Sequence, residues 1–315
     1  MPANMKMKKP GRVLALIILA AVVCSLIPAL WLYVKRSPSP YTNEQAIEKL
    51  KDNKGEYFAF VVLGDNHSGL IFNDSATLKL IRHINREDRF KKIPIDFVGI
   101  SGDVTCRGTG WDYRIYNKVR ALIKRPVISA IGNHDEDNNG RGLFGKYAGK
   151  NEFAFADRDS YFIVVDNTEG DISDEQFSRL EKELETSSHY AHRFVFVHKS
   201  PLSPYQQSWY RPELNPWSYR FMKLCEKYKV DIVFAGHEHM FKEEVFNGVR
   251  YIVSGGGGML IQIPDKDGGF LHYIMVRVYG DYVDYEVRKI CPPFWELLVY
   301  YIWKDAFYFL KDILF

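Results

Sequence analysis

Five short apolar runs, separated by helical patterns, most constrain how this chain of 315 residues can fold. Each run is four to seven residues long and rich in Val, Ile and Phe. This length and composition are typical of strands that are buried on both faces of a sheet. The runs cover residues 57–63, 95–100, 127–131, 194–197 and 232–235. Because these strands alternate with helices, the sequence predicts a layered α/β domain over residues 57–290.

One of the helical patterns carries its own start signal. Ser173 and Gln176 have the spacing of a capping box, in which each side chain accepts a hydrogen bond from the other residue's backbone. Phe177, Leu180 and Leu184 then fall on one helical face. We expect a helix that begins after Ser173 and packs this face on the sheet.

Each of the five apolar runs ends in side chains of the types that bind metals. The segments are Gly64-Asp65-Asn66-His67, Gly102-Asp103, Gly132-Asn133-His134-Asp135, His198 and Gly236-His237-Glu238-His239. Ligands bind outside the carboxyl ends of the strands in open α/β sheets, so these side chains are expected to converge. Imidazoles and carboxylates without thiolates suit Mn, Zn or Fe. Seven ligands exceed the three or four of one tetrahedral site and fit two ions that share a carboxylate.

In this order, the five segments resemble the pattern D-x-H, G-D, G-N-H-[DE], H, G-H-x-H of the calcineurin-like metallophosphoesterases, over roughly residues 57–280. The resemblance implies a four-layer α/β/β/α sandwich. It also implies two divalent or mixed-valence metal ions and hydrolysis of a phosphate monoester, diester or pyrophosphate by a metal-bound hydroxide. By motif, Asp65, His67 and His239 would bind the first metal, Asn133, His198 and His237 the second, and Asp103 would bridge them. His134 would donate a proton to the leaving oxygen, and Asp135 would orient its ring.

A long uncharged stretch precedes the α/β domain. Residues 13–34 carry no charge, and a helix of this length spans about 33 Å, close to the ~30 Å hydrocarbon core of a bilayer. We predict one transmembrane anchor here, with a cleaved signal peptide and a buried soluble helix as alternatives. The basic tail 1–12 has four Lys and Arg near the anchor, and Lys35 and Arg36 follow it. This bias predicts a cytoplasmic N-terminus and an extracytoplasmic domain on a single-pass protein of the cell membrane.

Two further segments bear on membrane attachment. Residues 35–56, which include Ser37-Pro38-Ser39-Pro40, are predicted to be a linker. Residues 291–315 are rich in aromatics and carry their charges on one side of a helical projection. They are predicted to form an amphipathic helix in the lipid headgroup region, the alternative being a helix packed on its own domain. The expected partners are therefore membrane lipids and a small-molecule or lipid-linked phosphate substrate.

Composition excludes some functions and leaves others open. A net charge of +3 argues against a nucleic-acid-binding protein, and the four cysteines form no metal knuckle.

Residues 201–218 follow His198 and are either a substrate loop or an ordinary surface loop. Gly255–Gly258 lacks the Lys-Ser/Thr of a P-loop and is interpreted as a tight backbone segment near the site. The sequence makes no prediction of the oligomeric state.

One residue separates the main hypotheses about activity. Pyrophosphatases of lipid A synthesis in the resembled family commonly have Arg where this chain has His134, which disfavours that substrate. The alternative to an enzyme is a catalytically silent, metal-binding sensor or scaffold tethered to the membrane. Because His134 is assigned no metal, its presence favours the enzyme.

Overall fold

Two mixed β-sheets form the centre of the computed structural model, which describes residues 27–28, 30–90, 94–202, 216–259, 261 and 263–290. The first sheet has the order β11-β10-β1-β2-β3 and the second the order β4-β5-β6-β7-β9-β8. The strands of the first are β1 (Tyr57–Leu63), β2 (Ile95–Ile100), β3 (Val127–Ser129), β10 (His272–Tyr279) and β11 (Tyr282–Lys289). Those of the second are β4 (Phe153–Asp157), β5 (Ser160–Val164), β6 (His192–Phe196), β7 (Ile232–Ala235), β8 (Phe241–Phe246) and β9 (Val249–Ser254).

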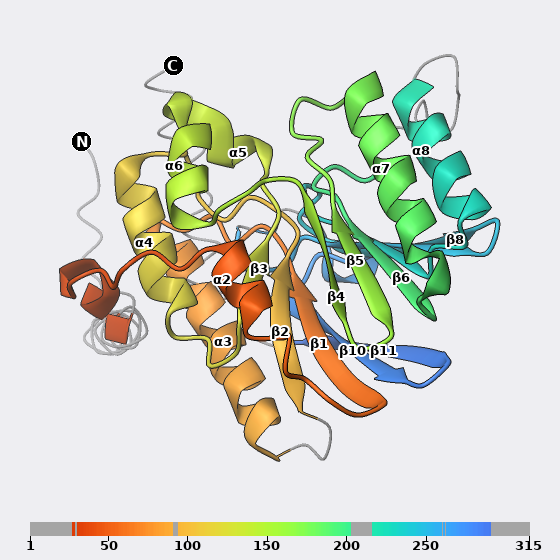
Figure 1. Ribbon diagram of the computed structural model, residues 1–315. Coiled ribbons are helices and arrows are strands. Elements are labelled where there is room, and N and C mark those ends of the chain that lie inside the picture. The colour runs from red at the N-terminus through yellow and green to blue at the C-terminus, as the bar shows by residue number, and fades with distance from the viewer. Residues whose placement is uncertain are drawn as a thin grey trace, which may run out of the picture.

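Helices cover the outer face of each sheet (Figure 1). On the first sheet these include α3 (Ile71–Phe90), α4 (Gly110–Arg120) and α6 (Arg141–Tyr147), and on the second α7 (Asp174–Thr186) and α8 (Pro216–Lys227). The short elements are α2 (Asn43–Glu48), α5 (Asn133–Glu136), η1 (Asp137–Asn139), η2 (Ser187–His189) and η4 (Asp265–Asp267). The succession of helices, sheet, sheet and helices is the arrangement that the resemblance to the metallophosphoesterases implies.

An aromatic cluster fills the space between the two sheets. Phe60 and Phe97 of the first sheet stack with ring centroids 5.1 Å apart, and Phe60 meets Phe162 and Phe194 of the second sheet edge-on. All four side chains are buried. Aromatic pairs of this kind contribute about 0.5–1.5 kcal/mol each beyond the burial of their surface. This packing fixes the two sheets relative to each other and so aligns the loops at their carboxyl ends.

The predicted strands and the capped helix agree with the structure. β1, β2 and β7 have the predicted bounds, whereas β3 ends at Ser129 and β6 begins at His192. In α7 the Ser173 hydroxyl accepts a hydrogen bond from the Gln176 backbone, and the Gln176 side chain accepts one from Ser173. Phe177, Leu180 and Leu184 are buried as expected.

The segment predicted to be a linker, residues 35–56, is partly folded onto the domain. Its helix α2 starts at a capping box formed by Thr42 and Gln45, a signal that the sequence already contains. The buried Asn43 amide donates to the carbonyl oxygen of Ser129 at 2.9 Å, and Ala46 and Leu50 pack between the sheets. The proline-rich start of the segment is also held, because Asn117 of α4 donates to the Pro38 carbonyl at 2.7 Å.

Several predictions concern residues outside the described ones: the tail 1–12, most of the anchor 13–34, most of the loop 201–218, and the segment 291–315. Within the described residues, no helix is both long and apolar enough to cross a bilayer.

The end of the predicted anchor packs on α3 and α4, an arrangement that we call the N-terminal joint (Leu32 and Tyr33 with Asp74 and Lys118). Leu32 is 1% exposed and packs in an apolar cluster formed with residues of α3 and α4. The Lys118 ammonium donates to the Leu32 carbonyl at 2.8 Å, and the Tyr33 hydroxyl donates to Asp74 at 2.7 Å. Trp31, which precedes Leu32 in the sequence, is 48% exposed.

Candidate metal centre

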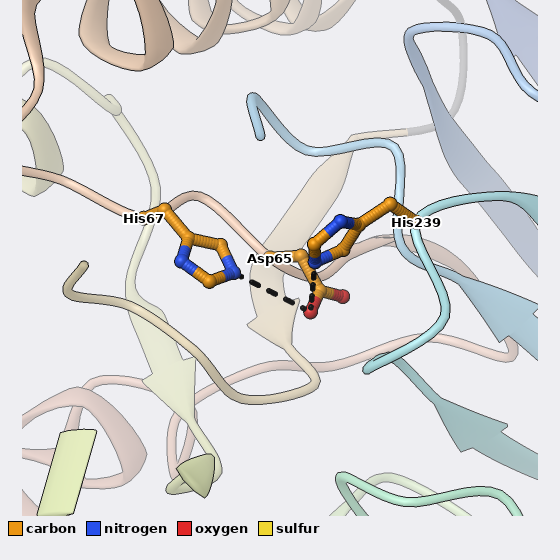
Figure 2. Close-up of side chains that lie close together, drawn as sticks. All are labelled: Asp65, His67 and His239. Carbon is orange, nitrogen blue, oxygen red and sulfur yellow. Dashed lines mark ion pairs between the residues drawn. The ribbon is translucent and has the colours of Figure 1, made fainter. Parts of the chain in front are cut away.

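The first group of candidate ligands joins the loops after β1 and β7. Asp65 and His67 follow β1, and His239 follows β7. Both imidazoles point their Nε2 atoms at Oδ1 of Asp65, at 3.9 Å from His67 and 3.7 Å from His239 (Figure 2). Asp65 and His67 are fully buried, and the three ligand atoms can face one cation. Residues 172 or more positions apart in the sequence therefore meet at one point, as the strand-end pattern predicts.

A second group lies next to the first, and its carboxylate also approaches His67 of the first group. Asp103, His198 and His237 bring their ligand atoms together at the ends of β2, β6 and β7. Oδ2 of Asp103 lies 3.4 Å from Nε2 of His198 and 3.3 Å from Nε2 of His67. Its other oxygen, Oδ1, accepts the backbone N–H of His134 at 2.9 Å. The carboxylate of Asp103 is thus fixed on one side and faces both groups with the other.

Asn133 and Asn167 set the position of His198. The Oδ1 atom of Asn133 lies 3.0 Å from Nε2 of His198, so it also reaches the second group. The other ring nitrogen, Nδ1, is 3.0 Å from the Ser101 carbonyl, which can accept its proton and leave Nε2 free for a cation. Asn167 accepts the backbone N–H of His198 at 2.9 Å. Sequence reasoning missed Asn167, although it follows the apolar run 161–165 just as the other site residues follow theirs.

The backbone at four of the ligands is left-handed. Asp65, His67, Asp103 and His237 have φ values of 63°, 46°, 51° and 70°. A residue with a side chain rarely adopts this conformation, and each instance costs on the order of 1–3 kcal/mol. Strain of this kind persists where the surrounding structure imposes it. It turns the side chains back over the ends of the strands and towards one another.

The glycine segment after β9 lies against the loop of the first group. The Gly257 N–H donates to the Gly64 carbonyl at 2.8 Å, and the Thr77 hydroxyl donates to the Gly257 carbonyl at 2.9 Å. A Cβ on Gly257 would fall on the same Gly64 oxygen. The interpretation of Gly255–Gly258 as a tight backbone segment near the site is confirmed.

The predicted contact between Asp135 and His134 is wrong. The Asp135 carboxylate accepts hydrogen bonds from the backbone of Gly132 (2.9 Å), Val104 (3.1 Å) and Thr105 (2.8 Å) and from the Thr105 hydroxyl (2.7 Å). It therefore fastens the loop after β3 to the loop after β2.

The ring of His134 is oriented by a different group. Its Nδ1 lies 2.9 Å from the Cys106 carbonyl, and Asp137 is 3.5 Å away. His134 and Asp135 are successive residues of the single-turn helix α5, so their side chains point in different directions. The side chain of Asp135 points inward, while that of His134 is 39% exposed at the edge of the site.

The protonation equilibria of the site differ from one imidazole to the next. Burial disfavours the charged imidazole of His198, but the carboxylate of Asp103 outweighs this and raises its pKa to about 9. Burial opposes ionisation of Asp103 as well, yet the neighbouring His198 and His67 hold its pKa well below the usual value. Burial and the charge of His198 together lower the pKa of His237 to about 4. Because a metal-ligating imidazole is neutral, a cation bound beside Asp103 would replace the proton that the raised pKa of His198 indicates.

The residues present fit divalent cations. Neither ring nitrogen of the buried His67 has a hydrogen-bond partner, so the ring is placed for another kind of ligand. The separations of 3.3–3.9 Å between neighbouring ligand atoms are near the ~3.4 Å edge of a tetrahedron whose metal–ligand bonds are about 2.1 Å. The donors are imidazole nitrogens and carboxylate oxygens, which suit Zn, Mn or Fe.

Comparison with known proteins agrees with this geometry. The family model of the calcineurin-like phosphoesterases matches residues 58–241. A protein of Ruthia magnifica named "Probable cyclic nucleotide phosphodiesterase" is 26% identical over 227 residues, which cover 69% of this chain and 93% of that protein. One of the same description from Xenorhabdus bovienii is 29% identical over 157 residues, covering 46% of this chain and 61% of that protein.

Two solved structures have the same fold. The purple acid phosphatase PPD1 of yellow lupin superposes with a TM-score of 0.56 at 17% identity, covering 80% of this chain and 53% of the lupin chain. This chain thus spans about half the length of that phosphatase. GAP50, described as the anchor in the inner membrane complex of Plasmodium, superposes with a TM-score of 0.58 at 14% identity, covering 75% of this chain and 85% of that one.

The chain belongs to the calcineurin-like phosphoesterase family. It is a metal-binding hydrolase that acts on phosphoester bonds.

Proposed function

We propose that this protein is a dinuclear metallophosphoesterase, in which Asp65, His67 and His239 bind one ion and Asn133, His198 and His237 bind the other. Asp103 bridges them. The observation that carries the proposal is the position of Oδ2 of Asp103, 3.3 Å from Nε2 of His67 and 3.4 Å from Nε2 of His198. A single carboxylate oxygen that faces an imidazole of each group is the arrangement that a shared ligand needs.

Two bound cations of the Mn, Zn or Fe type would polarise the phosphoryl oxygens and lower the pKa of a water molecule. The protein's own contribution is to position the substrate and to move a proton. His134 is the candidate general acid, because it lies at the edge of the site within reach of His67 and Asp103. Its Nδ1 is taken by the Cys106 carbonyl, which leaves Nε2 to carry the proton given to the leaving oxygen.

Two variants distinguish the shared metal ligand, Asp103, from the general acid, His134. Asp103→Asn removes the shared negative charge and is expected to lower the affinity for both ions and abolish turnover. His134→Ala is expected to keep about two ions per chain while turnover falls by about 10²–10⁴-fold, the usual scale for loss of a general acid. Metal content is measured by elemental analysis. Turnover is measured in the presence of Mn or Zn with three kinds of substrate: aryl phosphate monoesters, aryl phosphate diesters and a 3′,5′-cyclic nucleotide. If His134→Ala loses metal as Asp103→Asn does, the division of roles is wrong.

The competing hypothesis is a catalytically silent, metal-binding sensor or scaffold. It would be supported if the metal-loaded protein hydrolysed none of these esters. The exposed imidazole of His134 at the edge of the metal groups argues for the enzyme, because a scaffold has no use for a proton donor there.

We further propose that the protein is a single-pass protein of the cell membrane with its domain outside the cytoplasm. The uncharged residues 13–34 and the excess of basic residues before them support this. The N-terminal joint holds Leu32 and Tyr33 on α3 and α4, so these two residues belong to the domain and an anchor would consist of the residues before them. Protease treatment of intact spheroplasts tests the topology, and a domain protected from cleavage would contradict it.

A lipid-linked phosphate is the proposed substrate, because attachment at residues 13–34 and 291–315 would hold the domain near lipid headgroups. Deletion of residues 294–315 is expected to lower turnover of detergent-dispersed lipid phosphates more than turnover of a small soluble ester. An equal effect on both would show that the segment only packs on the domain.

A further inference from the structure

Lys199 is a half-buried cation that directly follows the metal-ligand residue His198. One side chain fixes both residues, since Oδ1 of Asn167 accepts the backbone N–H of His198 at 2.9 Å and that of Lys199 at 3.0 Å. The amide of Asn167 also donates to the Lys199 carbonyl at 2.7 Å. The backbone of Lys199 is therefore held as firmly as that of His198.

Among the residues that the structure describes, none provides an anionic partner for the ammonium group of Lys199. Its Nζ donates to the Thr168 carbonyl at 2.5 Å, and no carboxylate of a described residue lies within 4 Å of it. The Thr168 carbonyl holds this ammonium directly beside Asn167, the residue that fixes the backbone of His198, so the charge lies next to the second ligand group. Two of its three N–H donors are left over, and a half-buried ammonium with unused donors is stabilised when an anion binds.

Arg141, the neighbouring cation, differs from Lys199 in this respect. Its guanidinium donates to Asp166 at 2.6 Å and to the Thr168 hydroxyl at 3.2 Å, and it also pairs with Glu136. Carboxylates already neutralise its charge. Of these two cations that contact Thr168, Lys199 is the one available to an anionic substrate.

We propose that Lys199 is a specificity-determining residue that binds a non-bridging oxygen of the phosphate under attack and makes the enzyme prefer monoesters to diesters. A monoester phosphate has three non-bridging oxygens and two negative charges near neutral pH, whereas a diester has two oxygens and one charge. If two ions engage two oxygens, as the proposed function holds, the third is present only in the monoester. Charge-assisted hydrogen bonds to such an oxygen are about twice as strong as neutral ones.

The test compares Lys199→Met with the wild type and with Lys182→Met, which removes an exposed lysine of α7. We measure kcat/KM for p-nitrophenyl phosphate and for bis(p-nitrophenyl) phosphate, together with metal content. Lys199→Met is expected to lose about 10–100-fold on the monoester and less than about 3-fold on the diester, with metal content unchanged. Lys199→Arg should restore part of the loss, and Lys182→Met should behave as the wild type.

Equal losses on both esters, loss of metal, or no loss at all would overturn the proposal. Binding of inorganic phosphate to the metal-loaded proteins, followed by calorimetry, gives an independent result that does not depend on turnover. Lys199→Met should bind phosphate about 10–100-fold more weakly than the wild type, and equal affinity would refute the role of Lys199. If the wild type binds two metals and phosphate but hydrolyses neither ester, the proposed function fails while this binding comparison still decides the role of Lys199.

Discussion

Asp135 provides the sharpest test of how the site is held together. Replacing it by Ala removes the acceptor for three backbone N–H groups and one hydroxyl, all of them buried. A buried donor that loses its partner costs about 1–3 kcal/mol, so three backbone donors set a lower limit of about 3 kcal/mol on the loss of stability. Asp135→Asn keeps one acceptor oxygen but brings an NH₂ group against backbone donors, so we expect it also to lower the free energy of unfolding.

The assay is denaturant unfolding of the metal-free protein, followed by turnover of the metal-loaded protein under conditions where each variant is folded. The matched control is Asp137→Ala, which removes an exposed carboxylate 3.5 Å from Nδ1 of His134. Its free energy of unfolding should stay within about 0.5 kcal/mol of the wild type. If Asp135→Ala is as stable as the wild type yet loses turnover, Asp135 acts on the imidazole after all and our reasoning from its hydrogen bonds is refuted.

Three more predictions concern stability and metal binding. Ser173→Ala removes the cap of α7 and should lower the free energy of unfolding by about 1 kcal/mol in denaturant titrations, with turnover unchanged. Burial and the carboxylate of Asp96 raise the pKa of Asp157 to about 7. The stability that this raised pKa provides is complete below the unfolded pKa of about 3.9 and is lost as pH rises through about 7. Between pH 5 and 8, the free energy of unfolding of Asp157→Asn should therefore fall by about 1–3 kcal/mol less than that of the wild type. Parallel plots of unfolding free energy against pH for the two proteins would contradict this. Gly257→Ala places a methyl group on a backbone oxygen beside the first ligand group and should weaken metal binding in calorimetric titrations, whereas Gly142→Ala, where a Cβ meets nothing within 4 Å, should not.

The sequence predicted the parts of this structure that depend on local pattern. The strands β1, β2 and β7 have the predicted bounds, because their apolar runs end at a glycine or a turn. The convergence of Asp65 and Asp103 followed from the rule that parallel strands present their carboxyl ends at one edge of a sheet. His198 follows β6 of the second sheet and reaches Asp103 because the two sheets pack face to face.

The direction of individual side chains could not be predicted in the same way. Asp135 turns away from His134 because the loop after β2, some 30 residues earlier, supplies the N–H groups that it binds. Such contacts depend on how two loops meet, and no local pattern encodes that. Asn167 and Lys199 were missed for a related reason. Asn167 follows β5 and Lys199 follows β6, and the hydrogen bonds between them form only because these two strands are neighbours. The capping box at Thr42 was in the sequence and was overlooked beside a proline-rich stretch.

The left-handed backbone at Asp65, His67, Asp103 and His237 has a consequence for how such chains diverge. Glycine adopts these torsions without a steric penalty, so a side chain at each of these four positions is retained at a cost in backbone energy. A lineage that stopped binding metal would gain stability by drifting to glycine or asparagine at these four positions, and its glycines would record the lost activity. This chain has two aspartates and two histidines there, so its candidate ligands are held at a cost in backbone energy that glycine would not incur.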